Sequence, residues 1–394
     1  MSQNGKQHNQ SILNEDIKIS IFINSLAGGG AERVTSYLLP YLIKKGQSVV
    51  LVLTEEELAY PVPEEVPIYY LAKSKKNESG ILKLAKLPWL AYKYARFLKR
   101  ENITHSFSLL TRPCYVNIMA RWFTNHPYKL MISERNFPSM QYGGNDLQSR
   151  INNFLVKRLY PKADLVVSNA KASAQDLVDN FGVPKERTQT IYNPIDIDKI
   201  DKIEKLEGFF DADYVNAVSI GRLVPEKNHL FLLEAVVPFK NLRLYIFGEG
   251  ELRSQLEAKI KHLGLEEQVF LMGFESNPFQ YLKAADFFLF GSLNEGFPNV
   301  LMEAMCCGLP IVSTNCKSGP DEMMELKEAK TDDIMFTDYG ILTPVNNVAC
   351  MQKALDYVLQ HPEFLKACKP KLLQRIQDFR REPILEAYRS LFIA

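Results

Sequence analysis

Two glutamates flank the expected start of one helix in the second half of the chain. Residues 291–310, GSLNEGFPNVLMEAMCCGLP, follow an apolar run at 287–290 that has the character of a buried strand. Pro298 suits the first turn of a helix, because its missing N–H would have no intrahelical partner there. Glu295 then lies in the loop before the helix, and Glu303 lies within the helix beyond its first turn.

The backbone N–H groups near Asn299 and Val300 would point out of this helix start, where orphan donors and the helix dipole favour an anion. A bare phosphate fits poorly, because a carboxylate on each side would repel it. Carboxylates accept hydrogen bonds from hydroxyl groups. A nucleotide diphosphate sugar offers sugar hydroxyls, two phosphates and ribose hydroxyls in that order, so the stretch favours such a ligand. The alternative is an acidic loop followed by a core helix with solvated glutamates.

A second candidate is a pair of cations after the strand expected at residues 214–220. In residues 221–228, GRLVPEKN, Arg222 and Lys227 stand on either side of a turn. Two cations at a strand end can neutralise a diphosphate, the arginine through paired hydrogen bonds and the lysine as a mobile point charge. The alternative is a solvated loop.

Glycines form a third candidate site near the N-terminus. The run IKISIFIN at 17–24 predicts a buried parallel strand, and a helical pattern spans 31–45. Gly29 and Gly30 lie in the turn between them, where a backbone without side chains can approach a phosphate closely. The turn matches neither a Walker loop nor G-x-G-x-x-G, so a simple tight turn is the alternative.

Polar residues near two further strands, expected at 104–110 and 129–133, are candidates for holding a second substrate. The ends of strands in doubly wound sheets line the ligand crevice. One pair flanks the end of the first strand and the other pair follows the second strand. These candidates are His105, Arg112, Glu134 and Arg135. A packed position is the alternative for the histidine, and a local ion pair is the alternative for Glu134 with Arg135.

Composition predicts an ordinary globular protein of two domains. The chain has 394 residues, 46% of them hydrophobic and 24% charged, which is too long for one usual core. Its net charge of +1 hides an asymmetry: residues 1–180 hold 23 Lys and Arg against 15 Asp and Glu, and the remainder holds 24 against 31. The first half should therefore prefer anionic partners.

The expected compartment is the cytoplasm. The six cysteines show no metal-binding spacing and are most simply reduced thiols. No apolar run approaches the length of a bilayer span. Residues 1–16 are polar, lack the apolar core of a signal peptide and are expected to be disordered.

Residues 73–100 are strongly basic, with nine Lys and Arg, one acid at Glu78, and aromatic side chains between them. Such a composition suits adsorption to an anionic membrane surface, here the inner face of the cell membrane. A surface helix whose aromatic residues pack on the sheet is the alternative. Nucleic acid is not expected as a partner, because nothing beyond charge supports it.

Three of these stretches resemble one family. EGFPNVLME, residues 295–303, resembles the E-x7-E signature of the retaining glycosyltransferases of family 4, which have the GT-B fold. GRLVPEKN resembles that family's donor-diphosphate motif, and GGGAER, residues 28–33, resembles its first loop. The resemblance implies an α/β GT-B protein with two Rossmann-like doubly wound domains facing a central cleft.

The implied domains are an acceptor-side domain at 17–192, a nucleotide-sugar-binding domain at 193–382, and a last helix at 383–394 that crosses back to the first. The turn-forming Asn193-Pro194 marks the boundary.

The resemblance also implies the reaction. A sugar, hexose or N-acetylhexosamine, would pass with retention from a nucleotide diphosphate sugar, such as a UDP-sugar, to a glycan or lipid-linked saccharide in surface polysaccharide or glycoconjugate synthesis. Arg222, Lys227 and Glu295 would carry the catalysis. The implied donor-binding residues are Gly29, Gly30, Arg222, Lys227, Phe274, Glu295, Gly296, Phe297, Asn299, Val300 and Glu303.

No metal and no cofactor are expected. Asp211-Ala-Asp213 matches the D-x-D of metal-dependent transferases only superficially and is interpreted as solvated. Many relatives have a histidine where Arg135 stands, and an arginine stays protonated, so it is a poor general base. A GT-B sugar-nucleotide epimerase and a non-catalytic nucleotide-sugar-binding protein at a membrane surface remain as alternatives.

Overall fold

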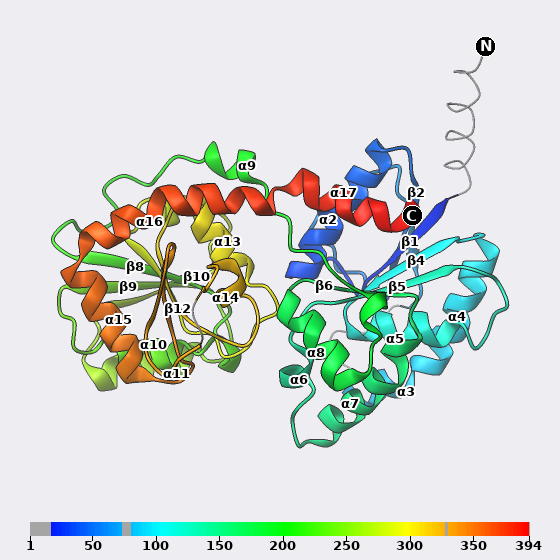
Figure 1. The fold of residues 1–394 in the computed structure, drawn as a ribbon, viewed down its shortest axis with the longest axis horizontal. Helices are drawn as coiled ribbons and strands as arrows, with labels where there is room; N and C mark the ends of the chain where they lie inside the picture. Colours follow the sequence, from blue (N-terminus) through cyan, green and yellow to red (C-terminus); the bar gives the residue numbers. More distant parts are fainter. Residues whose placement is uncertain (1–16, 73–79, 328–329, 394) are drawn as a thin grey trace, which may run out of the picture. The chain divides into compact units, whose positions relative to one another are not determined.

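The computed structural model describes residues 17–72, 80–327 and 330–393, which are drawn as a ribbon in Figure 1. The chain divides into two compact units, one of Met1–Pro194 with Arg381–Ala394 and one of Ile195–Arg380. Each unit holds a seven-stranded sheet with helices packed against it. The prediction of an α/β protein built from two Rossmann-like sheets is confirmed.

The sheet of the first unit is parallel throughout, in the order β3-β2-β1-β4-β5-β6-β7. Its central strands carry β-branched and apolar side chains that are buried, as is usual for strands covered on both faces. The order reverses between β1 and β4, where sheets of this kind bind ligands beyond the carboxyl ends of the strands. The strands are β1 (Lys18–Phe22), β2 (Ser48–Leu53), β3 (Ile68–Tyr70), β4 (His105–Leu109), β5 (Lys129–Glu134), β6 (Leu165–Ser168) and β7 (Thr188–Thr190).

Helices cover this sheet. They are α2 (Gly30–Lys44), α3 (Gly80–Ala85), α4 (Leu87–Arg100), α5 (Thr111–Ala120), α6 (Pro138–Gln141), α7 (Leu147–Leu159), α8 (Lys171–Phe181) and α17 (Arg381–Ile393), with short 3₁₀ turns η1 (Tyr160–Lys162) and η2 (Lys185–Arg187). The last of them, α17, belongs to this unit although the second unit precedes it in sequence (Figure 1, red). Glu386 of α17 accepts a hydrogen bond from the Tyr41 hydroxyl of α2 at 2.7 Å, and Phe392 packs edge-on against Phe107 of β4.

The sheet of the second unit has the order β10-β9-β8-β11-β12-β14-β13, and among the ladders of its described residues only the β13–β14 pair is antiparallel. Its order reverses between β8 and β11, so the loops after these two neighbouring strands meet at one edge. The strands are β8 (Val215–Ile220), β9 (Leu242–Phe247), β10 (Val269–Gly273), β11 (Phe287–Phe290), β12 (Ile311–Thr314), β13 (Met335–Thr337) and β14 (Gly340–Thr343).

The helices of the second unit are α9 (Ile197–Asp201), α10 (His229–Val236), α11 (Arg253–Leu263), α12 (Phe279–Leu282), α13 (Asn299–Cys306), α14 (Pro320–Met323), α15 (Val348–Gln360) and α16 (Pro362–Arg375), with η3 (Pro225–Lys227) and η4 (Ile376–Phe379). Among the described residues of the whole chain, no helix combines the length and the apolar character that a membrane span requires.

Two glycines of the second unit differ in how tightly the backbone around them is packed. Gly340 has φ +146°, and a Cβ built there would overlap the carbonyl oxygen of Ile311 on the neighbouring strand β12. Gly264, at the end of α11, also has a positive φ, +66°, but a Cβ there meets nothing within 4 Å. The first glycine is therefore required by both its backbone angle and its neighbour, and the second by its backbone angle alone.

Alanine at these two positions should cost different amounts of stability. We expect Gly340→Ala to destabilise the second unit by about 3 kcal/mol or more, because a neighbouring strand must move to admit the methyl group. The matched Gly264→Ala should cost only about 1–2 kcal/mol, for its left-handed backbone alone. Chemical denaturation followed by far-ultraviolet circular dichroism measures both, and equal costs would contradict the argument.

Candidate functional site

The loop after β11 and the start of α13 form one wall of the predicted donor site. Helix α13 begins at Asn299, and Pro298 is its N-cap with φ −71° and ψ 108°. The prediction of Pro298 in the first turn is therefore wrong by one position, because its extended ψ lets its carbonyl accept from the N–H of Leu301 at 3.1 Å. The first turn still begins with Asn299 and Val300, the two residues predicted to face an anion. Glu303 lies in the same helix and is 4% exposed.

The two donor motifs of the second unit are bonded to each other. Lys227, at the end of η3, forms an ion pair with Glu295 in the loop before α13. Ser292 lies 2.7 Å from Glu295 Oε1 and 3.0 Å from the carbonyl oxygen of Glu226, within reach of its one hydroxyl proton. The N–H of Leu293 donates to the same carbonyl at 2.8 Å. The loops after β8 and β11 are thereby joined into one unit.

Burial makes this ion pair stronger than a typical surface pair. The side chain of Lys227 is 21% exposed and that of Glu295 is 13% exposed, so water screens their attraction only in part. In this structure the lysine predicted for a diphosphate and the glutamate predicted for sugar hydroxyls bind each other. Each can exchange its partner for a suitable ligand group, a phosphate for the lysine and a hydroxyl donor for the carboxylate.

The remaining predicted donor residues of the second unit differ in their surroundings. Arg222 follows β8 and its side chain is exposed. The Gly296 carbonyl accepts a hydrogen bond from Ser318 at 2.6 Å, so it holds the loop in place. Phe297 is buried against Phe379, with ring centroids 5.4 Å apart, which indicates a packing role. Phe274 follows β10 and is 78% exposed, so its ring is available to a ligand.

In the first unit, the predicted glycine turn opens helix α2. Gly29 is the N-cap and Gly30 the first helical residue. A Cβ at Gly29 would overlap the carboxylate of Glu32, which lies in the first turn of the same helix. The helix start is thus close-packed by an acidic side chain, and the role of the two glycines in binding a diphosphate stays a prediction.

Glu134 ends β5, is 2% exposed, and has four hydrogen-bond donors around its carboxylate. Its Oε1 accepts from the N–H groups of Arg135 at 2.9 Å and Asn136 at 3.2 Å. Its Oε2 accepts from the hydroxyls of Tyr142 at 3.2 Å and Tyr160 at 3.0 Å. Burial raises the pKa of Glu134, and these hydrogen bonds offset only part of the rise.

The guanidinium of Arg135 does not pair with Glu134. It donates to the Tyr388 hydroxyl of α17 at 2.9 Å and to Asn193 Oδ1, next to the end of the first unit's main segment. The side chain is 7% exposed, and its Nε finds no hydrogen-bond partner among the described residues. The local ion pair considered from sequence is therefore wrong. Arg135 instead ties the end of β5 to the segment before the unit boundary and to the last helix.

Arg112 and His105 lie at opposite ends of β4. Arg112, in α5 beyond the carboxyl end, donates to Asn24 at 3.1 Å and pairs with Glu55 at 3.0 Å, so it links the segments after β1 and β2. His105 is the first residue of β4, contacts Thr104 and packs edge-on against Phe392. The prediction that His105 flanks a ligand-facing strand end is wrong, because parallel strands present their carboxyl ends to the ligand crevice.

Comparison with known proteins identifies the family. One family model, Glycosyltransferase Family 4, matches residues 28–199, and a second, Glycosyl transferases group 1, matches residues 201–374. A relative from Campylobacter jejuni is 40% identical over 368 residues, which cover 93% of this chain and 97% of the relative. Its name is N-acetylgalactosamine-N,N'-diacetylbacillosaminyl-diphospho-undecaprenol 4-alpha-N-acetylgalactosaminyltransferase.

The chain belongs to glycosyltransferase family 4.

Other matches agree with this assignment. An uncharacterized glycosyltransferase of Methanocaldococcus jannaschii is 31% identical over 360 residues, 84% of this chain and 88% of the relative. The structure of Anabaena HepE in complex with UDP aligns with a TM-score of 0.71 at 20% identity, covering 95% of this chain and 99% of HepE. Sucrose-phosphate synthase of Thermosynechococcus elongatus aligns with a TM-score of 0.79 at 16% identity, with coverage of 95% and 99%. The GT-B fold is confirmed, and neither the epimerase nor the non-catalytic alternative is supported.

Two residues beside the donor motifs of this glycosyltransferase were not predicted from sequence. Ser292 joins the two motifs, and its S-x-x-E spacing to Glu295 was the available signal. His229 directly follows the GRLVPEKN motif and is 2% exposed. Burial first, and then the nearby Lys227 ammonium, lower the pKa of His229 to about 4. His229 is therefore neutral near pH 7 and adds no positive charge to the site.

The buried carboxylate of Glu134 predicts a pH dependence of stability. Because burial raises its folded pKa above the unfolded value near 4.5, the group stabilises the protein at low pH. That contribution is lost as the pH rises from the unfolded pKa through the folded pKa. We expect Glu134→Gln, which keeps the hydrogen-bonding shape without a charge, to lose less stability than the wild type over that rise. Melting temperatures of both proteins across the acidic range measure the difference. Parallel curves for the two proteins would show that Glu134 ionises in the folded state as easily as in water.

Proposed function

We propose that this glycosyltransferase transfers N-acetylgalactosamine from UDP-N-acetylgalactosamine to a saccharide linked to a lipid diphosphate, as a step in building a surface glycan or glycoconjugate. The sugar and the acceptor class are suggested by the name of the Campylobacter jejuni relative. The nucleotide is suggested by the UDP complex of HepE. The single structural observation that supports the proposal is the bonded Lys227–Glu295 pair, which brings a phosphate-binding group and a hydroxyl-binding group to one edge of the sheet.

The departing UDP gains negative charge on its diphosphate as the bond to the sugar breaks. Cations and N–H groups that are already in place stabilise that charge without reorganisation, and such stabilisation supplies most of the rate enhancement in many enzymes. Lys227 is partly buried and held by Glu295 and the surrounding loop, so its ammonium is preset. Arg222 follows the neighbouring strand end with an exposed guanidinium that can close on a phosphate. The start of α13 adds its dipole.

Glu295 would change partners when the donor binds. The diphosphate competes for the Lys227 ammonium, which leaves the Glu295 carboxylate to accept hydrogen bonds from hydroxyls of the transferred sugar. Ser292 keeps the carboxylate near its position during this exchange, because it lies 2.7 Å from Oε1 and is anchored to the loop. Glu303, in helix α13, would hold the ribose hydroxyls.

The proposed chemistry retains the anomeric configuration. The acceptor hydroxyl attacks the anomeric carbon on the face from which UDP leaves, the carbon–oxygen bond to the diphosphate breaks, and a new glycosidic bond forms. The acceptor proton passes to the leaving phosphate oxygen, so a protein base is not required. Arg135 is unsuited to be that base, because a guanidinium stays protonated and this one is engaged with Tyr388 and Asn193.

Replacement of Lys227 tests the charge argument. We expect Lys227→Ala to lower kcat about 100- to 1000-fold with a much smaller change in KM for the sugar nucleotide, because leaving-group charge is greatest in the transition state. The assay uses UDP-N-acetylgalactosamine and detects the glycosylated acceptor by its mass. Lys366→Ala, at an exposed lysine of α16 in the same unit, is the matched control and should behave like the wild type. A raised KM at unchanged kcat would instead assign Lys227 to ground-state binding.

Transfer should not depend on a divalent metal. The Asp211-Ala-Asp213 stretch matches a metal motif only superficially: Asp213 is exposed, and Asp211 pairs with Arg243 at 2.9 Å and accepts from the N–H of Asp213 at 3.1 Å. The cations that oppose the diphosphate are side chains. We expect the rate with excess chelator to stay within about twofold of the untreated rate, since no metal-based charge stabilisation is lost. Loss of activity that added Mg²⁺ or Mn²⁺ restores would refute metal independence.

A further inference from the structure

Helix α4 presents two aromatic residues to solvent. Its inner face is apolar and buried, and includes Tyr94 and Phe97. Trp89 and Tyr92, three residues apart and so on one face of the helix, are 49% and 46% exposed. The packing alternative from sequence thus holds for the inner face of the helix, and membrane adsorption stays a prediction for its outer face. The basic residues at 73–79 lie outside the described residues.

A second pair of exposed aromatic residues lies next to this face. Trp122 and Phe123 follow α5, and they are 55% and 44% exposed. The rings of Tyr92 and Phe123 meet edge to face with centroids 6.0 Å apart, so the pair continues the outer face of α4. Large aromatic groups that gather on a surface mark an interaction site more often than single exposed ones do.

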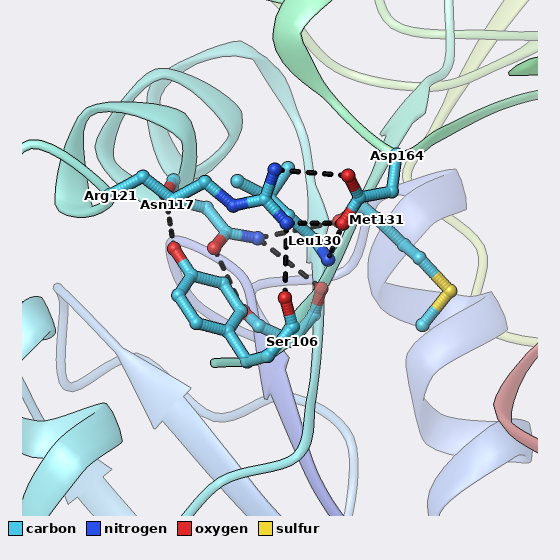
Figure 2. A network of polar contacts seen from close by, with 7 residues as sticks. Ser106, Asn117, Arg121, Leu130, Met131 and Asp164 are labelled. Carbon is cyan, nitrogen blue, oxygen red and sulfur yellow. Dashed lines mark hydrogen bonds and ion pairs between the residues drawn. The ribbon is translucent and has the colours of Figure 1, made fainter. Parts of the chain in front are cut away.

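Arg121, the residue before Trp122, is anchored to neighbouring elements by its side chain (Figure 2). Arg121 donates to Asp164 Oδ1 at 2.9 Å and to the carbonyl of Tyr128 at 3.0 Å. Asp164 also accepts from the N–H of Leu130 at 2.8 Å, which fixes it to β5. The two aromatic residues therefore stand outward on an anchored turn rather than on a loose loop that could fold back.

Cations accompany most of these rings. Lys93 Nζ lies 4.0 Å from the Trp89 ring centroid, and the Arg96 guanidinium lies 5.9 Å from that of Tyr92. Lys162 Nζ lies 5.3 Å from the Trp122 ring centroid. Helix α4 contains no acidic residue. We call the set the interfacial patch, and it consists of Trp89, Tyr92, Lys93, Arg96, Trp122, Phe123 and Lys162.

We propose that the interfacial patch docks the enzyme on an anionic lipid bilayer. Trp and Tyr rings favour the headgroup level of a membrane, where one side of the ring is apolar and the other is wet. Lys and Arg beside them attract anionic headgroups within a Debye length. The patch joins both features on α4 and the neighbouring turn. The inference rests on the proposed function only for the reason why docking is useful: an acceptor linked to a lipid lies at such a surface.

Both tryptophans of the chain belong to the patch, so their fluorescence reports on it directly. We expect emission to shift to shorter wavelength and protein to cosediment when vesicles of phosphatidylglycerol and phosphatidylcholine are added. With vesicles of phosphatidylcholine alone, or with the anionic vesicles at high salt, we expect little emission shift and little cosedimentation. Cosedimentation without a change in emission would place the membrane contact elsewhere, and equal binding to both vesicle types would remove the anionic requirement. Either result would overturn the proposal.

Three variants separate this patch from the rest of the surface. Trp122→Ala with Phe123→Ala, and independently Lys93→Glu with Arg96→Glu, should each weaken binding to anionic vesicles at least tenfold. Lys366→Glu on α16 makes a single charge change outside the patch and should weaken it less than twofold. Circular dichroism checks that each variant is folded. Unchanged vesicle binding by both patch variants would refute the proposal.

Activity on a water-soluble acceptor distinguishes this proposal from the proposed function. With an acceptor that carries a short, soluble lipid substitute and with no vesicles present, the two patch variants should keep the wild-type rate. Vesicle binding without transfer to any acceptor would remove the proposed function and leave the docking surface standing. Transfer without vesicle binding would refute the docking proposal and leave the proposed function standing.

Discussion

The donor motifs of the second unit depend on one short connection, the carbonyl of Glu226. Ser292 lies within hydrogen-bonding distance of it and Leu293 donates to it, so the loop after β11 is tied to the loop after β8. The same tie brings Lys227 and Glu295, one on each loop, within reach of an ion pair. A partly buried pair of opposite charges resists separation unless other groups replace the lost partner, since each charge is less well solvated there than at an open surface. The geometry of the donor motifs is thus set by backbone contacts before any ligand enters.

The end of β5 in the first unit shows a different use of buried charge. Neighbouring residues, one acidic and one basic, are both buried, yet their side chains do not pair. Glu134, the last residue of β5, meets Tyr142 and Tyr160, while Arg135, directly after the strand, meets Tyr388. Each charge is stabilised by neutral hydrogen-bonding groups from other elements. Hydrogen bonds at the end of this strand therefore connect the segment after α6, the turn η1 and the helix α17. This makes the strand end a structural centre of the unit.

Much of the fold followed from local patterns, because buried parallel strands are continuous apolar runs and glycine turns separate them from helices. The residues proposed for the donor site were also accessible from sequence, since Glu295, Glu303, Arg222 and Lys227 belong to short motifs. Local patterns could not show which way a side chain points or which distant residue it contacts. Nothing in the sequence around Arg135 indicates that its guanidinium reaches Tyr388, 253 positions away. Such facts depend on long-range packing and on a register of one or two residues.

The second half of the chain is acidic overall, although its proposed diphosphate site is cationic. Residues 181–394 carry 24 Lys and Arg against 31 Asp and Glu, yet they contain the site proposed for a diphosphate. Screening limits surface charges to a range of about 8–10 Å at physiological salt, so distant acids matter little there. Two acids of the donor motifs are themselves engaged: Glu295 holds Lys227, and Glu303 lies inside a helix at 4% exposure. An acidic unit can therefore offer a locally cationic site. Under the docking proposal the basic first half would serve the opposite purpose, because many anionic headgroups of one membrane surface would act together on the cations of the interfacial patch.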